Sequence, residues 1–235
     1  MKEFNLFMIP YAGGSSSVYR KWKKDFSKNI NVVFLELSGR GSRYREPLYL
    51  HLKDTVDDIY NQILDVTTHS RKGYSFFGHS MGALIAYELA YKIQESSIQN
   101  PDYLFISGHM PPHLRKQTDR YKMPDNKFLK EIIKLGGSSK ALLESTELAD
   151  IILPILKADM QSVETYEHYQ RPKKLNIDMH IFNGEKDITT INHLIKEWSI
   201  FTERNCYVNH FKGNHFFIDD NYKEITRIIN QVMIG

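Results

Sequence analysis

The sequence predicts an α/β fold with a mostly parallel sheet and helices on both faces. Short apolar runs of strand character alternate along the chain with segments of helical periodicity, which is typical of such a sheet. One helical stretch without a convincing strand, residues 111–174, interrupts the alternation. No linker-like change of composition divides the 235 residues. We therefore expect one domain, residues 1–235, with a helical insertion at about 111–174.

The expected strands are 5–9, 32–37, 74–77, 103–107, 178–182 and 207–211. Between the second and the third, apolar residues recur at spacings of three and four, which predicts an amphipathic helix. These residues are Leu52, Val56, Ile59, Ile63 and Val66. Residues 83–90 favour a helix directly after the third strand. Apolar stripes at 191–198 and 222–232 predict two further helices, one before and one after the last strand.

The insertion is expected to consist of helices. One amphipathic segment runs from about residue 128 to Gly136-Gly137, and a longer one runs from Glu147 to about Tyr169. Helices inserted here lie where a lid over a site at the edge of the sheet would lie. Their apolar residues exceed what a small helix pair can bury on itself, so we expect most to pack on the main body and some to line a pocket.

Composition and charge argue against several classes of function. The net charge is +3, which is small for nucleic-acid binding without a concentrated basic stripe. No apolar span reaches the ~18 residues of a membrane helix, and the apolar run 4–9 is too short for a signal peptide. Cys206 is the one cysteine, so an internal disulfide or a cysteine zinc site cannot form. We expect a cytoplasmic monomer without nucleic-acid or membrane partners.

Basic residues gather in three short clusters. They are Arg20, Lys21, Lys23 and Lys24; Arg40, Arg43 and Arg45; and Arg115, Lys116, Arg120 and Lys122. Such clusters usually form a solvated face. The alternative is that they steer the docking of an acidic partner.

The pentapeptide Gly78-His79-Ser80-Met81-Gly82 is the most informative motif. It has the form G-x-S-x-G and lies between an expected strand and an expected helix, as a nucleophile elbow does. Glycine at both flanks leaves room for the strained turn that lifts the serine out of the strand. The helix that follows brings free N–H groups and positive dipole close to the serine oxygen. The motif makes Ser80 the candidate nucleophile.

A serine hydroxyl needs a neighbouring base, and the base needs an acid that fixes its tautomer. In folds with this elbow the acid follows a late strand and the histidine follows the last one. His215 lies directly after the last expected strand, and Asp187 follows the penultimate one. Thr189 and Thr190 are expected to cap the helix beyond. We predict Ser80, Asp187 and His215 as the catalytic residues.

Other titratable residues fit these roles less well. His79 flanks the nucleophile and is expected to pack beside the elbow. Asp159, within the helical insertion, is a weaker rival for the acid. Asp219 and Asp220 follow the predicted histidine too closely, and we expect them to cap the last helix.

Acyl transfer also needs N–H donors for the developing oxyanion. One is the N–H of Met81, which follows the nucleophile. The loop after the first strand, residues 10–15, contains a glycine pair and is expected to supply the other, the N–H of Ala12. A glycine pair could also form a phosphate loop, but neither G-x-x-x-x-G-K-[ST] nor G-x-G-x-x-G is present. We predict a site that needs no metal and no cofactor.

Together these motifs resemble the type II thioesterases, the free-standing editing hydrolases of nonribosomal peptide and polyketide assembly lines, which have the α/β-hydrolase fold. The resemblance runs nearly end to end. Besides the elbow, it is carried by 10–14, 39–47, 135–137, 153–159 and 213–217. One departure is Ser38, where the family usually has proline before Gly-Arg-Gly; the change affects a turn and does not touch the chemistry.

The resemblance implies hydrolysis of acyl groups held as thioesters on the phosphopantetheine arm of carrier proteins, which clears stalled or wrong acyl units from a synthase. It implies that Ser80 attacks the carbonyl, that His215 is base and then acid, and that Asp187 orients the imidazolium. The partners would be phosphopantetheinylated acyl or peptidyl carrier proteins. Two alternatives stay open: a lipase-like hydrolase of oxygen esters, and a catalytically silent docking partner of a synthase. The presence of Ser80, Asp187 and His215 argues against the docking partner.

Overall fold

A computed structural model describes residues 4–69, 72–96, 98–136 and 146–235. Its centre is a six-stranded sheet in which every pairing is parallel, which confirms the predicted fold class. The strands are β1 (Phe4–Ile9), β2 (Ile30–Phe34), β3 (Tyr74–His79), β4 (Tyr103–Ser107), β5 (Asp178–Gly184) and β6 (Cys206–Phe211). Their spatial order is β2-β1-β3-β4-β5-β6. The chain winds from β1 outward to β2 and then crosses to β3, and such a reversal opens a crevice at the carboxyl ends of β1 and β3.

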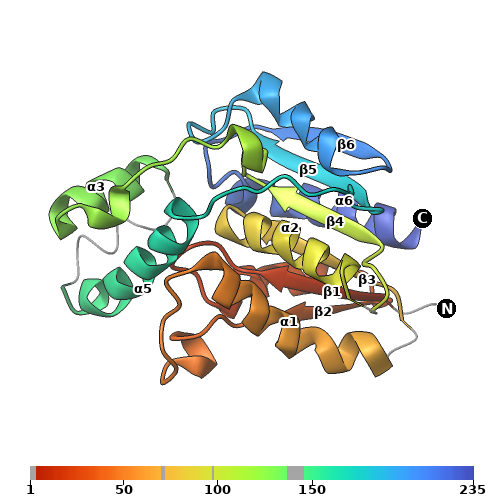
Figure 1. Cartoon of the computed structure of the whole chain (residues 1–235), viewed down its shortest axis with the longest axis horizontal. Coiled ribbons are helices and arrows are strands. Elements are labelled where there is room, and N and C mark those ends of the chain that lie inside the picture. Colours follow the sequence, from red (N-terminus) through yellow and green to blue (C-terminus); the bar gives the residue numbers. More distant parts are fainter. Residues whose placement is uncertain (1–3, 70–71, 97, 137–145) are drawn as a thin grey trace.

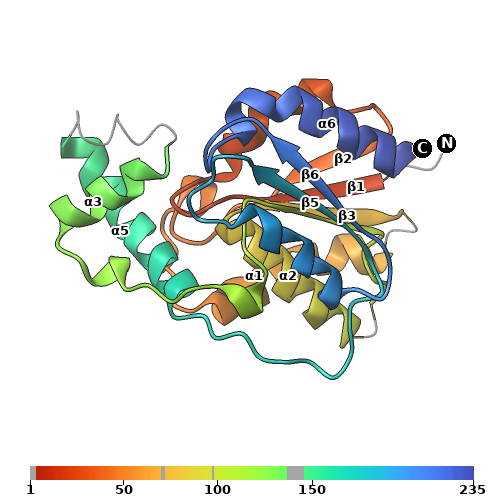
Figure 2. The ribbon, with the colours of Figure 1, turned by 90° about the horizontal axis from the view of Figure 1, so that it is seen from above.

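Helices cover both faces of the sheet (Figures 1 and 2). One face carries α1 (Leu52–His69), α2 (Met81–Gln94) and the 3₁₀ helix η5 (Asn192–Phe201), and the other carries the 3₁₀ helix η1 (Ser16–Asp25) and α6 (Ile218–Ile234). Side chains alternate between these two cores along each strand. Phe7 and Ile9 of β1 pack in the core with α2, whereas Leu6 and Met8 pack in the core with α6. None of the described helices is both long and apolar enough to cross a membrane.

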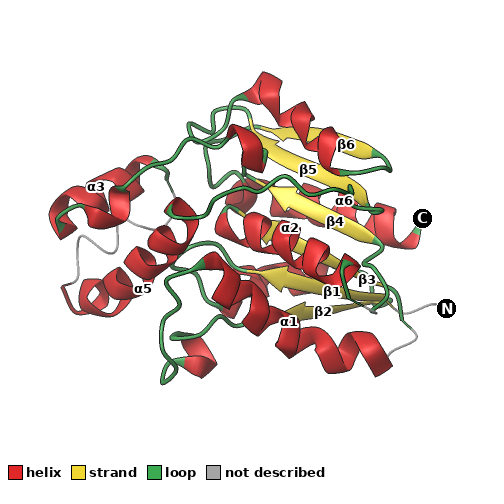
Figure 3. Cartoon of the chain, in the orientation of Figure 1, coloured by secondary structure: helices red, strands yellow, loops and turns green. Residues whose placement is uncertain are grey.

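In the part that the structure describes, the segment between β4 and β5 has helices at 112–164 and then runs without a helix to β5. It contains η3 (Pro112–Leu114), η4 (Arg120–Lys122), α3 (Asp125–Lys134) and α5 (Thr146–Glu164). Helices α3 and α5 stand apart from the layered body, beyond the carboxyl ends of the strands (Figure 3). They share a small apolar cluster of Phe128, Ile132, Leu156 and Met160, against which Ala12 packs. The two helices therefore lie over the loop that follows β1.

The ends of these two helices follow from local chemistry. After α3 ends, Gly136 adopts a φ of +93°, a left-handed conformation that favours glycine. Gly137, the second glycine of the predicted stop, lies outside the described residues. Helix α5 ends at Glu164, earlier than predicted, and the Arg115 guanidinium donates to the carbonyl oxygens of Glu164 and Tyr166 there, at 3.5 and 2.7 Å.

Two further elements differ from their predictions. Strand β2 starts and ends earlier than the predicted range 32–37, because β1 stops offering partners once the Leu35 N–H has bonded to the Met8 carbonyl oxygen. The helix predicted at 191–198 is the 3₁₀ helix η5, in which side chains recur every three residues. Ile191 precedes this helix and is 40% exposed, so it does not belong to the buried stripe.

Candidate active site

The turn at Ser80 has the strained backbone that a nucleophile elbow requires. Ser80 connects β3 to α2 with φ 55° and ψ −117°, and it is the one non-glycine residue with positive φ in the described part of the chain. A Cβ atom at Gly78 would lie 2.0 Å from the carbonyl oxygen of Gly82, and a Cβ atom at Gly82 would lie 2.3 Å from that of Ile9. Close backbone packing therefore requires glycine at both flanks of the motif.

His215 joins Ser80 to Asp187 through two hydrogen bonds. Its Nε2 lies 3.0 Å from the Ser80 Oγ, and its Nδ1 lies 2.8 Å from the Asp187 Oδ2. When Nδ1–H donates to the carboxylate, Nε2 keeps a lone pair that can accept the serine proton. The side chains of His215 and Asp187 are 4% and 0% exposed, so water competes little for these bonds. The structure thus brings the three predicted side chains together in the order serine, histidine, carboxylate.

Thr189 is a fourth member of this cluster that the sequence reasoning missed. Its N–H and its hydroxyl donate to the Asp187 Oδ1 at 2.8 and 2.7 Å, and its Oγ1 lies 3.1 Å from the His215 Nδ1. Burial alone raises the pKa of Asp187, but hydrogen bonds from His215 and Thr189 bring it below its ordinary value. The prediction that Thr189 and Thr190 cap a helix is wrong, because η5 starts after Ile191, which provides no side-chain cap.

The loops that carry the acid and the base are fastened to each other. They follow the adjacent parallel strands β5 and β6, so both reach the sheet edge at which β3 presents Ser80. The Lys186 N–H donates to the Gly213 carbonyl oxygen at 2.9 Å. A Cβ atom at Gly184 would lie 2.5 Å from the carbonyl oxygen of Asn214. Glycine at the end of β5 therefore permits the close approach of the two loops.

His79 packs beside the elbow, as predicted. Its Nδ1 lies 2.9 Å from the Ser107 Oγ, and the Ser107 carbonyl oxygen accepts the Ser80 N–H at 2.8 Å. Burial lowers the pKa of His79 well below its ordinary value, so its ring stays neutral. The His79 ring packs against the His215 ring at a centroid distance of 4.9 Å. A neutral ring there fills space beside the base without adding a charge.

The two predicted oxyanion donors follow β1 and β3, which are neighbours in the sheet. Met81 is the first residue of α2, where N–H groups have no acceptor within the helix. In the turn after β1, the Gly14 N–H donates to the Tyr11 carbonyl oxygen at 2.9 Å, and the Gly13 N–H donates to the Asp159 Oδ2 at 2.7 Å. These bonds engage two of the N–H groups of the turn and leave that of Ala12 as the candidate donor.

The rival carboxylates are engaged elsewhere. Both oxygens of Asp159 accept hydrogen bonds from the Arg40 guanidinium, at 2.5 and 2.7 Å, so Asp159 cannot serve His215. Asp219 and Asp220 do not cap α6 as predicted, because the N-cap residue is Phe217. They lie in the first turn instead, where negative charge complements the helix dipole.

The first basic cluster forms a solvated face on η1 as expected. Its members are Arg20, Lys21, Lys23 and Lys24. The expectation is wrong for Arg40, which is buried, and for Arg43, which donates to the two Asp58 carboxylate oxygens at 2.6 and 2.8 Å. Arg120 of the third cluster pairs with Glu164 at 2.7 Å. These three arginines of the second and third clusters therefore hold parts of the fold together. In the ranges that the structure describes, no group of three His, Cys, Asp or Glu side chains could hold a metal ion.

His109, which follows β4 near the site, makes stability depend on pH. Burial lowers its pKa to about 4, so below pH 6.5 the unfolded chain binds a proton that the folded chain excludes. Stability therefore falls as pH falls from 6.5 towards 4. We expect urea unfolding of His109→Gln to show a loss between pH 7 and pH 5 that is about 2 kcal/mol smaller than in the wild type.

Glutamine at this position can still donate to the Met110 carbonyl oxygen, which the His109 Nδ1 approaches at 2.7 Å. Any packing cost of the substitution is common to both pH values and cancels in the difference. His193→Gln, at an exposed residue of η5, is the matched control and should follow the wild type. Equal losses in His109→Gln and the wild type would contradict the prediction.

Comparison with known proteins agrees with this geometry. The family model described as "Thioesterase domain" matches residues 4–233. The chain is 32% identical to the gramicidin S biosynthesis protein GrsT of Aneurinibacillus migulanus, over 99% of this chain and 90% of that protein. The crystal structure of ClbQ from the colibactin NRPS/PKS pathway superimposes with a TM-score of 0.92, 33% identity and coverage of 98% of this chain and 97% of ClbQ.

The type II thioesterase BorB from the borrelidin biosynthetic cluster superimposes with a TM-score of 0.87 at 25% identity, over 97% of this chain and 92% of BorB. Each of these three proteins is thus little longer than the part that matches. The structure has the α/β-hydrolase fold that the resemblance implies. The chain belongs to the thioesterase domain family and is a type II thioesterase of the α/β-hydrolase superfamily.

Proposed function

We propose that this chain hydrolyses acyl thioesters held on the phosphopantetheine arm of synthase carrier proteins, with Ser80 as nucleophile, His215 as base and Asp187 as its orienting acid. One observation carries the assignment of roles: the His215 ring is hydrogen-bonded to the serine hydroxyl on one side and to the buried carboxylate on the other. An imidazole held in this way accepts a proton at Nε2 and is stabilised as a cation by the carboxylate at Nδ1.

The reaction then runs in two halves. The Ser80 Oγ attacks the thioester carbonyl carbon while its proton passes to the His215 Nε2. The negative charge that develops on the carbonyl oxygen is met by the N–H groups of Ala12 and Met81. His215 gives its proton to the departing thiol of the pantetheine arm, which leaves an acyl ester on Ser80. A water molecule attacks that ester while its proton passes to the His215 Nε2. His215 then returns this proton to the departing Ser80 Oγ, which releases the free acid and restores the enzyme.

The segment 111–174 fits the role of a lid within a single catalytic domain. Its α5 contacts the turn after β1 through Asp159, and a Cβ atom at Gly136, after α3, would lie 2.5 Å from the Asn214 side chain beside the base. Lid segments of this kind exclude water from reactive acyl intermediates. The apolar cluster of α3 and α5 packs on Ala12, beside the place where the acyl group would bind. Action as a monomer in the cytoplasm completes the proposal.

The test compares one acyl group on two carriers. The purified chain is given a carrier protein loaded with a short acyl thioester and, separately, the ethyl ester of the same acid. We expect kcat/KM for the acyl-carrier protein to exceed that for the ester by about a hundredfold or more, because binding energy from the carrier and the arm lowers the barrier.

The alternatives give different results in the same assay. A lipase-like enzyme would cleave the ester, and longer apolar esters, at least as well as the carrier thioester. A silent docking partner would bind the carrier protein and turn over neither substrate. A panel of acyl groups on one carrier protein then gives the chain-length preference.

A further inference from the structure

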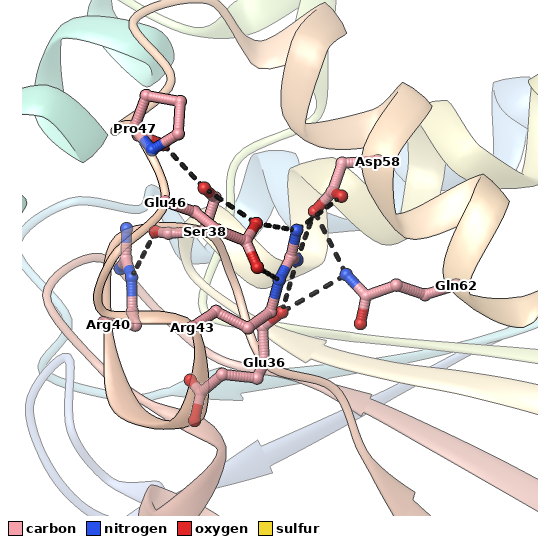
Figure 4. A network of polar contacts seen from close by, with 8 residues as sticks. All are labelled: Glu36, Ser38, Arg40, Arg43, Glu46, Pro47, Asp58 and Gln62. Carbon is pink, nitrogen blue, oxygen red and sulfur yellow. Dashed lines mark hydrogen bonds and ion pairs between the residues drawn. The ribbon is translucent and has the colours of Figure 1, made fainter.

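The loop 38–47, which follows β2, carries a polar network that the catalytic relay does not use. Figure 4 shows Arg43 in contact with Glu46, Asp58 and the carbonyl oxygen of Glu36, which fastens the loop to α1. Within this network, Arg40 makes one bond, from its Nε to the Ser38 carbonyl oxygen at 3.3 Å. The loop is therefore anchored by one arginine while the other is directed elsewhere.

Arg40 is held in place by the two glycines that flank it. Gly39 and Gly41 have φ values of +77° and +53°, which side chains rarely adopt. A Cβ atom at Gly39 would lie 2.4 Å from a Leu48 side-chain carbon, and one at Gly41 would lie 2.0 Å from a Glu36 carboxylate oxygen. A side chain at either position would be strained by the backbone angle, even if Leu48 and Glu36 moved aside. The Gly-Arg-Gly sequence thus aims one buried guanidinium in one direction.

That direction is the turn proposed to form the oxyanion hole. Arg40 donates to both carboxylate oxygens of Asp159 and, through Nη1, to the Gly14 carbonyl oxygen at 3.3 Å. Asp159 in turn accepts the Gly13 N–H at 2.7 Å. The side chains of Arg40 and Asp159 are each 6% exposed. Two buried charges therefore bind the N–H of the Ala12–Gly13 peptide and the carbonyl oxygen of the Gly14–Ser15 peptide.

These bonds determine the orientation of the peptide groups in the turn. The Gly14 N–H closes a four-residue turn onto the Tyr11 carbonyl oxygen, with Ala12 and Gly13 in the middle. Gly13 has a φ of +75°, the feature that separates a type II turn from a type I turn, in which the central peptide is flipped. An anion on the Gly13 N–H selects one of these two orientations. The Ala12 N–H belongs to the preceding peptide. The bonds to the Gly13 N–H and the Gly14 carbonyl oxygen fix the path of the backbone that carries it.

Asp159 belongs to α5, whereas the turn directly follows strand β1 of the sheet. We propose that Arg40 and Asp159 are positioning residues that hold the oxyanion turn in its active conformation, and that they make the oxyanion hole depend on the seating of α5. This inference rests on the proposed role of the Ala12 N–H. When α5 leaves its position, the Gly13 N–H loses its acceptor and Arg40 loses its counterion, so the backbone that carries the Ala12 N–H is no longer held in place.

The test separates transition-state binding from ground-state binding. A trifluoromethyl ketone carrying the acyl group accepts the Ser80 Oγ at its carbonyl carbon, the serine proton passes to His215, and the new oxyanion occupies the hole. A thioether analogue with a methylene in place of the carbonyl makes no such adduct. For Asp159→Asn we expect kcat and trifluoromethyl ketone affinity to fall in parallel by roughly 10²–10³-fold, with thioether affinity unchanged within threefold.

The matched control lies on the same helix. Glu164 of α5 is also buried and paired, with Arg120 at 2.7 Å and the Tyr121 N–H at 3.0 Å, but these partners belong to η4 and not to the turn. Glu164→Gln should lower the melting temperature without changing the ratio of the two inhibitor affinities. A purely structural role for Asp159 would give the Glu164→Gln pattern in both variants and would overturn the proposal.

A second variant covers the case in which Asp159→Asn does not fold. Arg40→Lys keeps the positive charge beside Asp159 but loses the paired geometry of the guanidinium, and we expect the same selective loss of trifluoromethyl ketone affinity. An unchanged affinity ratio in Arg40→Lys would also overturn the proposal. Failure of the wild-type chain to hydrolyse acyl-carrier thioesters would instead contradict the proposed substrate. The ratio of the two inhibitor affinities would still show whether Arg40 and Asp159 position the turn.

Discussion

Replacing Ser80 by alanine is expected to lower kcat for acyl-carrier thioesters by roughly four to six orders of magnitude. The substitution removes the atom that forms the acyl-enzyme, while the oxyanion donors and the substrate site stay in place. The residual rate is then that of water attacking a bound thioester. The measurement is single-turnover hydrolysis of an acyl-carrier protein, with mass spectrometry of the intact enzyme to detect the acyl group on the wild-type chain.

A second serine of the same strand provides the control. Ser75 is fully buried in β3, and its hydroxyl has no hydrogen-bond partner. Ser75→Ala should therefore leave turnover and acyl-enzyme formation unchanged. The backbone strain at Ser80 is no reason for the alanine variant to unfold, because alanine meets the same steric cost at φ 55° that serine already bears. Activity of Ser80→Ala within about a hundredfold of the wild type would rule out Ser80 as the nucleophile.

The parts of the fold that depend on local pattern were predictable. Strands buried on both faces are apolar along their whole length, which is why runs such as 74–77 and 103–107 stood out. The elbow was also readable, because Gly78 and Gly82 are required by backbone contacts within one strand–turn–helix unit. Chain order then selected Asp187 and His215 from many other acids and histidines. In the structure His215 bonds to Ser80, and Asp187 bonds to His215.

What escaped prediction depends on contacts between distant segments. Arg40 and Asp159 are 119 positions apart, and neither residue alone shows that it has a buried partner. The glycines around Arg40 were the available signal, since two left-handed glycines beside one charge suggest that its direction matters. Thr189 was assigned to a helix cap by its type, but the carboxylate of Asp187 competed successfully for both its N–H and its hydroxyl.

Thr189 also determines how an asparagine side chain would be oriented in place of Asp187. Asp187→Asn is expected to lower kcat by about four orders of magnitude through the wrong histidine tautomer. The two donors of Thr189 both point at Oδ1, so they will hold the amide oxygen of the introduced side chain on that side. The amide NH₂ then faces the His215 Nδ1, which must become an acceptor. The proton moves to Nε2, where it blocks transfer from Ser80.

Asp187→Ala separates this tautomer effect from the loss of charge. Without a side chain at this position, the His215 Nδ1–H can donate to the Thr189 Oγ1, which already lies 3.1 Å away, so Nε2 keeps its lone pair. We expect Asp187→Ala to retain about tenfold more activity than Asp187→Asn, although it loses more of the original side chain. Single-turnover rates of both variants, with the imidazole N–H resonances from NMR, test the order. A more active Asp187→Asn would show that charge and not tautomer is what Asp187 supplies to the base.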